Sequence, residues 1–84
     1  MADSYDAPFA AFDKRLRTVD DLAERWVAFV DLADHLEREL ELFRRRQRQE
    51  IARGFREQGK TWKEIGSIMG GVSYQRAHQF GKGE

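Results

Sequence analysis

The chain has 84 residues, which is enough for one small domain or for a small domain joined to a long helix. It contains no cysteine, and this excludes disulfide bonds, cysteine-ligated zinc and thiol catalysis. Its 15 basic and 15 acidic residues cancel overall, but residues 1–42 hold 11 acids and 5 bases (net −6), whereas residues 43–84 hold 4 acids and 10 bases (net +6). The basic C-terminal half favours a polyanionic partner. The alternative is that the two halves attract each other, within one chain or between chains.

The pattern of the sequence predicts an all-α protein. Strand-like alternation of useful length is absent, and the single proline is Pro8. No apolar run approaches the roughly 18 residues of a membrane span, and the opening MADSYDAPFA has neither the basic start nor the apolar core of a secretion signal. We therefore expect a cytoplasmic protein without a membrane partner, a cofactor, a metal ion or a small-molecule ligand.

Residues 1–17 are expected to begin as a loose segment and to continue as a short helix. Asp6 is a suitable cap for this helix, and Pro8 would fall in its first turn, where proline is tolerated. Phe9, Phe12 and Leu16 would share its apolar side.

A long amphipathic helix of the coiled-coil or bundle type is predicted over residues 18–48. Thr18 is its expected cap, and Asp21, three residues on, suits the positive end of the helix dipole. From Val19 onwards apolar residues recur at alternating steps of three and four, which is the heptad rhythm of a helix that packs along another helix. The residues predicted to form this dimerisation seam are Leu22, Trp26, Phe29, Ala33, Leu36, Leu40 and Phe43.

The seam favours a homodimer, because one short C-terminal unit cannot cover so long a stripe. The alternative is that the helix folds back on the C-terminal half as part of its core, and the bulky Trp26 and Phe29 fit a bundle better than a plain two-stranded coil. The polar side of the helix is acidic, so that anionic lipid would repel it. A protein partner for this acidic side is compatible with the pattern.

The helical pattern continues through residues 43–60, and the sequence leaves open whether residues 18–58 form one unbroken helix. Ile51 and Phe55 are four residues apart and are predicted to face inward. Gly59 is predicted to end the helix. At 100° per residue, a basic stripe would face outward, nearly opposite that apolar pair. This stripe contains Arg45, Gln49, Arg53, Arg56 and Lys60.

A helix-turn-helix unit is predicted in the C-terminal part, residues 49–84. Thr61 and Glu64 have the spacing of a capping box for its first helix. The pair Gly70–Gly71 permits the positive φ angles of a sharp turn, and Ser73 would cap the second helix. The residues predicted to face inward, with Gly66 as the point of close helix approach, are Trp62, Ile65, Ile68, Met69, Val72, Ala77 and Phe80.

This pattern resembles the helix-turn-helix segment of sigma-factor region 4 and of many small actinobacterial DNA-binding proteins. The resemblance covers about residues 48–80 and implies a second helix that is presented to DNA. The chain departs from the pattern of these proteins in two ways. It has two glycines where their turn usually has one, and its second helix has only about two turns. The matching residues are Trp62, Glu64, Ile65, Gly66, Gly71, Val72, Ser73, Gln75, Ala77, His78 and Gln79.

The outward side of the second helix carries residue types that read DNA. Glutamine forms bidentate bonds with adenine, and histidine bonds to guanine edges. The residues predicted to face the bases are Tyr74, Gln75, His78 and Gln79. The residues predicted to contact phosphates are Arg53, Arg56, Lys60, Lys63, Ser73 and Arg76. The arginine run at residues 44–48 is either a solvated charge run or a further DNA contact.

These observations predict a sequence-preferring double-stranded DNA-binding protein, a small transcriptional regulator that acts as a homodimer. An enzyme is not expected, because Asp31 and His35 lack the further ligands of a dinuclear helical metal site, and no nucleophile has a base at a suggestive spacing. The alternative function is a protein-interaction module, antitoxin-like or a polymerase or sigma adaptor, that uses the acidic N-terminal helix. RNA binding also remains open at this point.

Overall fold

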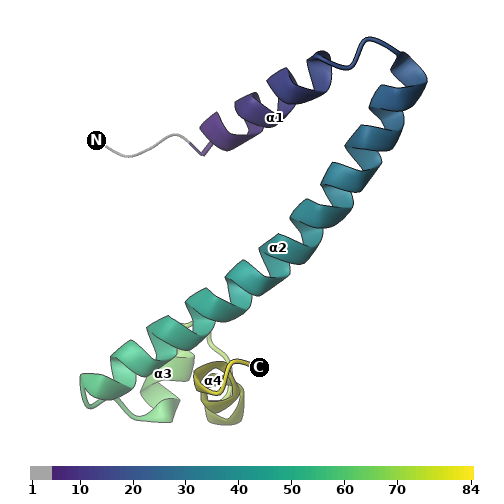
Figure 1. The fold of residues 1–84 in the computed structure, drawn as a ribbon. Coiled ribbons are helices and arrows are strands. Elements are labelled where there is room, and N and C mark those ends of the chain that lie inside the picture. The colour runs from purple at the N-terminus through teal and green to yellow at the C-terminus, as the bar shows by residue number, and fades with distance from the viewer. Residues whose placement is uncertain (1–4) are drawn as a thin grey trace. The chain divides into compact units, whose positions relative to one another are not determined.

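The computed structural model describes residues 5–84 and confirms the all-α prediction. Within those residues the chain forms four helices and no strand (Figure 1). They are α1 (Ala7–Arg17), α2 (Leu22–Glu57), α3 (Trp62–Ile68) and α4 (Tyr74–Gly81). Most of the segment predicted to be loose lies outside the described residues.

The chain divides into two compact units, Met1–Glu37 and Arg38–Glu84, and the division falls inside α2. The first unit holds α1 and the beginning of α2, whereas the second holds the rest of α2 with α3 and α4.

Helix α1 begins where the sequence predicted, with Pro8 in the first turn. Asp6 is at the N-cap position, but its side chain forms no capping hydrogen bond with the helix. Phe9 and Phe12 are on neighbouring turns, with ring centroids 5.6 Å apart in an edge-to-face arrangement. Helix α1 ends at Arg17, which is followed by Thr18 as the C-cap.

The prediction that Thr18 caps α2 is wrong. Thr18 keeps right-handed helical backbone angles, and its hydroxyl donates a hydrogen bond to the carbonyl oxygen of Arg15 at 2.6 Å. It therefore closes α1. The cap of α2 is Asp21, whose Oδ2 accepts a hydrogen bond from the backbone N–H of Glu24 at 2.9 Å.

Helix α2 is unbroken from Leu22 to Glu57, which answers the question that the sequence left open. As predicted, its end is marked by Gly59, which has a φ of +85°. Most side chains of the predicted dimerisation seam are exposed, and Trp26 is 64 % and Phe43 49 % exposed. Ala33 and Leu36 are half-buried. Leu16 of α1 shares one hollow with Leu22, Trp26 and Phe29 of this seam. Dimerisation remains a prediction.

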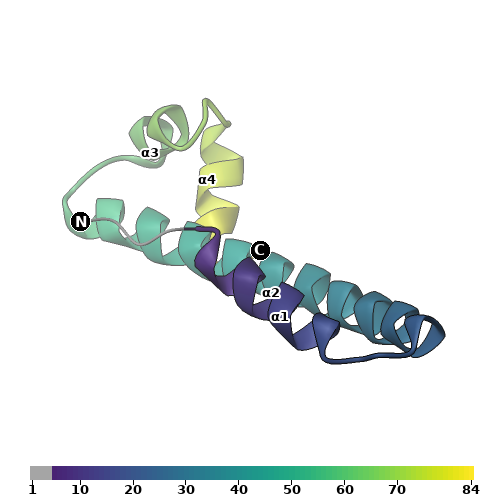
Figure 2. The ribbon, with the colours of Figure 1, turned by 90° about the horizontal axis from the view of Figure 1, so that it is seen from above.

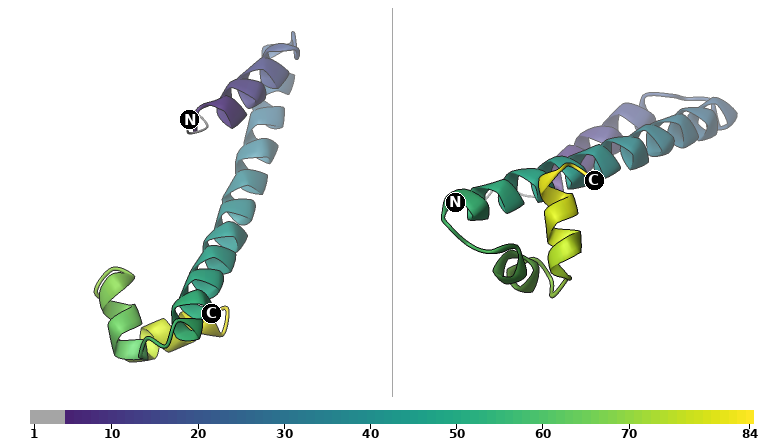
Figure 3. Two further views of the ribbon diagram at one scale, coloured as in Figure 1. Left: turned by 90° about the vertical axis from the view of Figure 1, so that its left-hand side faces the viewer. Right: turned by 90° about the horizontal axis from the view of Figure 1, so that it is seen from below.

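The core of the second unit lies where α3 and α4 pack on the C-terminal part of α2, and Figures 2 and 3 show α3 and α4 beside that part of α2. Ala52, Ile65 and Ala77 are fully buried and Phe80 is 6 % exposed. Partly buried side chains complete this core, namely Phe55, Trp62, Met69 and Val72. The predicted inward set is thus confirmed except for one residue.

That exception is Ile68, which is 53 % exposed, and Ile51 on α2 is also wrongly predicted because it is 46 % exposed. Ala52 is the residue of α2 that enters the core. It lies about 100° round the helix from Ile51. The small alanine allows α2 to approach the other helices, whereas the larger isoleucine stays on the outside.

Candidate functional site

The start of α3 is held by the predicted capping box. The hydroxyl of Thr61 accepts a hydrogen bond from the backbone N–H of Glu64, and the Glu64 carboxylate accepts one from the backbone N–H of Thr61, both at 3.1 Å. The bond from the Thr61 backbone, with a second contribution from the Thr61 side chain, lowers the pKa of Glu64 below its ordinary value.

We predict that this carboxylate makes the stability of the second unit dependent on pH. Because the pKa of Glu64 is lower in the folded chain than in the unfolded chain, its stabilising contribution is present at neutral pH and is lost as the pH falls below about 4.5. The variant Glu64→Gln keeps an acceptor for the cap but does not titrate. Urea unfolding followed between pH 6 and pH 3 should show a larger fall in midpoint for the parent than for the variant. Equal falls would contradict the prediction.

The turn between α3 and α4 depends on three glycines. Gly70 and Gly71 have φ angles of +98° and +71°, as predicted. A Cβ at Gly66 would overlap the carbonyl oxygen of Val72. The backbone N–H of Val72 donates to the carbonyl oxygen of Gly66 at 2.9 Å, which ties the turn to α3. Ser73 then caps α4, as predicted, by accepting a hydrogen bond from the backbone N–H of Arg76 at 3.1 Å.

Helix α4 is anchored on one side and open on the other. The buried side chains of Ala77 and Phe80 hold it against the core. All four residues predicted to face the bases, Tyr74, Gln75, His78 and Gln79, are exposed, and the structure brings them together around one shallow depression of about 450 Å³. Trp62, Lys82 and Glu84 complete the lining of this depression.

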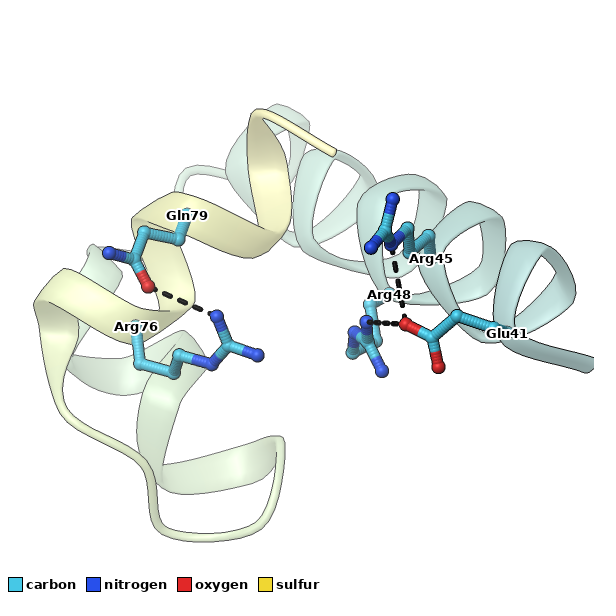
Figure 4. Close-up of polar contacts among 5 residues, drawn as sticks. All are labelled: Glu41, Arg45, Arg48, Arg76 and Gln79. Atoms are coloured by element: carbon cyan, nitrogen blue, oxygen red, sulfur yellow. Dashed lines mark hydrogen bonds and ion pairs between the residues drawn. The ribbon is translucent and has the colours of Figure 1, made fainter. Parts of the chain in front are cut away.

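The residues predicted to contact phosphates differ in how accessible their side chains are. Lys63 and Arg76 are exposed on α3 and α4, whereas Lys60 is half-buried. The hydroxyl of Ser73 is occupied by the cap described above. Arg76 lies along α4, where its Nη1 donates to Oε1 of Gln79 at 3.1 Å (Figure 4) and its guanidinium carbon is 4.7 Å from the centre of the Phe80 ring.

Arg53 and Arg56 are exposed, as the prediction of an outward-facing basic stripe requires, but both also bond to backbone outside α2. Nε of Arg53 donates to the carbonyl oxygen of Gly81 at the end of α4, at 2.9 Å. Nη1 of Arg56 donates to the carbonyl oxygen of Lys60, and its guanidinium carbon lies 5.2 Å from the centre of the Trp62 ring. These arginines therefore border the helix-turn-helix pair, although both remain exposed.

Part of the arginine run on α2 is engaged within the second unit. Glu41 accepts a hydrogen bond from Nε of Arg45 at 3.3 Å and lies 4.0 Å from Nη2 of Arg48 (Figure 4). The guanidinium carbon of Arg48 is 5.3 Å from the centre of the Phe80 ring. Arg48 thus covers the core and is half-buried, so it is not a simple solvated charge.

Gly81 and Lys82 also belong to the site, although no pattern in the sequence had predicted them. Gly81 is buried, and a Cβ there would lie 2.7 Å from Cη2 of Trp62. The Trp62 ring in turn packs edge-on against His78, with ring centroids 5.1 Å apart. The signal that could have identified Gly81 is its spacing of four residues from the buried Ala77, since this places both on one side of α4.

Comparisons with known protein families, with characterised proteins and with solved structures found no match for this chain. Between residues 5 and 84, no group of three or more histidine, aspartate or glutamate side chains is placed to hold a metal ion. Over the same residues, no helix combines the length and the apolar character that crossing a bilayer requires.

Proposed function

We propose that this chain is a sequence-preferring double-stranded DNA-binding protein, a small transcriptional regulator in which α3 and α4 form a helix-turn-helix and α4 is the recognition helix. The observation that carries the proposal is the two-sided character of α4. Its buried residues fix it to the core, and its exposed side presents hydrogen-bonding groups on a short, capped helix. An α-helix of this kind fits the major groove of B-form DNA.

The charge of the second unit supports the same proposal. Lys63 on α3 and Arg76 on α4 are both exposed, so these two cations are accessible to backbone phosphates. The basic half of the chain attracts the backbone, and α4 then samples the base edges. Binding should weaken steeply as the salt concentration rises, because each neutralised phosphate releases counterions.

A fluorescence-anisotropy titration tests the proposal with two exposed single variants. Gln75→Ala removes a predicted base contact, so the discrimination between a selected duplex and a random duplex should fall by about 1–3 kcal/mol. Lys63→Ala removes a predicted phosphate contact and should weaken both duplexes equally. If the two variants exchange these effects, the recognition side is wrongly assigned. If the parent protein raises the anisotropy of no duplex even at low salt, DNA binding is refuted.

We further propose that two chains associate through the predicted seam on α2. The support is the exposure of bulky apolar side chains at heptad spacing, including Leu22, Trp26, Phe29 and Leu40. A patch of this kind on a small protein is typical of an interaction surface. Two joined copies would place two recognition helices on one DNA molecule and would favour operators with two half-sites.

Sedimentation equilibrium tests the dimer. The parent is expected at roughly twice the chain mass of 9.9 kDa. Leu40→Glu places a charge in the seam and should lower the mass towards that of one chain. Arg38→Glu introduces the same side chain on the opposite side of α2 and should leave the mass unchanged. A concentration-independent mass of 9.9 kDa for the parent would exclude the dimer.

The exposed apolar seam also favours one alternative, a protein-interaction module such as an antitoxin or a polymerase adaptor. In that case the seam and the acidic side of α2 would bind a different protein. This alternative predicts that the parent protein is a monomer and does not bind DNA. The anisotropy titration and the sedimentation experiment therefore separate it from the DNA-binding proposal.

A further inference from the structure

A shallow basic depression of about 320 Å³, open to solvent and named the basic cavity, adjoins the outward side of α4. It lies within the second unit, where the C-terminal part of α2, the first residue of α3 and the end of α4 meet. Its lining residues are Arg53, Arg56, Glu57, Trp62, His78, Gly81 and Lys82.

The aromatic wall of this cavity is built by the Trp62 ring. The absence of a side chain at Gly81 gives this ring its place, since any Cβ there would press against Cη2 of the indole. His78 packs against the ring at 5.1 Å between centroids. Arg56 lies over the ring, with its guanidinium carbon 5.2 Å from the ring centre. The wall is therefore held in place from three sides.

Two of the cations in the cavity are positioned by backbone carbonyl groups. Arg53 and Arg56 each give one hydrogen bond to such a group, to Gly81 and to Lys60 respectively. A guanidinium has five N–H donors, so each arginine retains four for a ligand. The bond to Gly81 also offsets the negative end of the α4 dipole, which would otherwise repel an anion from this cavity.

The charges of the lining favour an oxyanion. Arg53, Arg56 and Lys82 carry three positive charges, and Glu57 carries one negative charge. Guanidinium groups match the geometry of phosphate oxygens, and lysine supplies a point charge. The chemistry that fits the cavity is thus a phosphate group, either a free ion or a phosphodiester.

The position of the cavity selects between these two sources. It shares Trp62, His78 and Lys82 with the depression around the predicted base-facing residues. A phosphate held here would therefore adjoin the bases that α4 reads. We propose that this cavity binds one backbone phosphate of the same DNA duplex, with Lys82 as a direct contact. This inference rests on the proposed DNA-binding function.

The salt dependence of duplex binding tests the inference. Lys82→Gln removes one positive charge at the C-cap of α4, and this lysine side chain forms no hydrogen bond to the core that the substitution would break. The control Lys14→Gln removes the same charge from α1, outside the second unit. In a plot of log K against log salt concentration, Lys82→Gln should reduce the slope by about 0.9, the value for one lost phosphate contact. Lys14→Gln should leave the slope unchanged. Equal slopes for the two variants would overturn the inference.

A second measurement tests phosphate binding to the cavity in the absence of DNA. Inorganic phosphate is titrated at constant ionic strength while the NMR signal of the Trp62 indole N–H is followed. A saturable shift in the parent that is lost in Lys82→Gln supports the cavity as a phosphate site. If the parent binds no duplex but shows this shift, the DNA-binding function and the duplex source fail, and the site is one for free phosphate. If phosphate causes no shift and Lys82→Gln behaves like Lys14→Gln on DNA, the cavity is not a phosphate site.

Discussion

Replacing Ala77 with glutamate is expected to unfold the second unit. Ala77 lies on the buried side of α4 and is fully buried in the core, so the new carboxylate would enter an apolar environment without a partner. The core contains only four buried apolar residues. A penalty of about 4 kcal/mol or more is therefore comparable to the whole stability of so small a core.

A matched variant separates burial from charge in this experiment. Gln75→Glu introduces the same carboxylate two residues earlier, at an exposed position in the first turn of α4 where negative charge suits the helix dipole. It should keep the dispersed NMR signals of the Ile65 and Val72 methyl groups, whereas Ala77→Glu should lose them. Retention of these signals in Ala77→Glu would show that the packing described here is wrong.

Replacing Gly66 with alanine is expected to destabilise the same unit by about 3 kcal/mol. The added methyl group would collide with the backbone carbonyl oxygen of Val72, and backbone cannot move aside as a flexible side chain can. The hydrogen bond from the N–H of Val72 to the carbonyl oxygen of Gly66 would have to lengthen or break. Hydrogen exchange of the amides in α3 and α4 reports the free energy of opening of this unit.

Gly54 provides the control for this substitution. It lies inside α2, and a Cβ added there would meet no atom within 4 Å. Gly54→Ala should therefore stabilise the protein by about 1 kcal/mol, through helix propensity alone. If both alanine variants change the stability in the same direction, the close approach at Gly66 does not govern the packing of the turn.

The features that could be predicted from the sequence are those set by local chemistry. The capping box of Thr61 and Glu64, the cap at Ser73 and the positive φ angles of Gly70 and Gly71 each depend on residues within a few positions of one another. The outward side of α4 could also be predicted, because buried Ala77 and Phe80 determine which residues of so short a helix remain exposed.

The errors arose where one helix meets another. The periodicity of α2 indicates an apolar side, but the choice of Ala52 over Ile51 depends on how closely α3 and α4 approach. The same contact brings Arg53 to the end of α4, and no local pattern in the sequence encodes that bond. The error at Thr18 had a different origin: a threonine at a helix boundary is able to close the preceding helix as well as to open the next.

The continuity of α2 across both units constrains how the protein can be divided. A cut between Glu37 and Arg38 would pass through the interior of a helix, where it would leave up to four carbonyl groups on one side and four N–H groups on the other without their helical partners. Neither fragment would begin or end at a natural helix terminus at the position of the cut. An isolated C-terminal fragment would therefore need a new serine or aspartate ahead of its first turn before its binding could be compared with that of the whole chain.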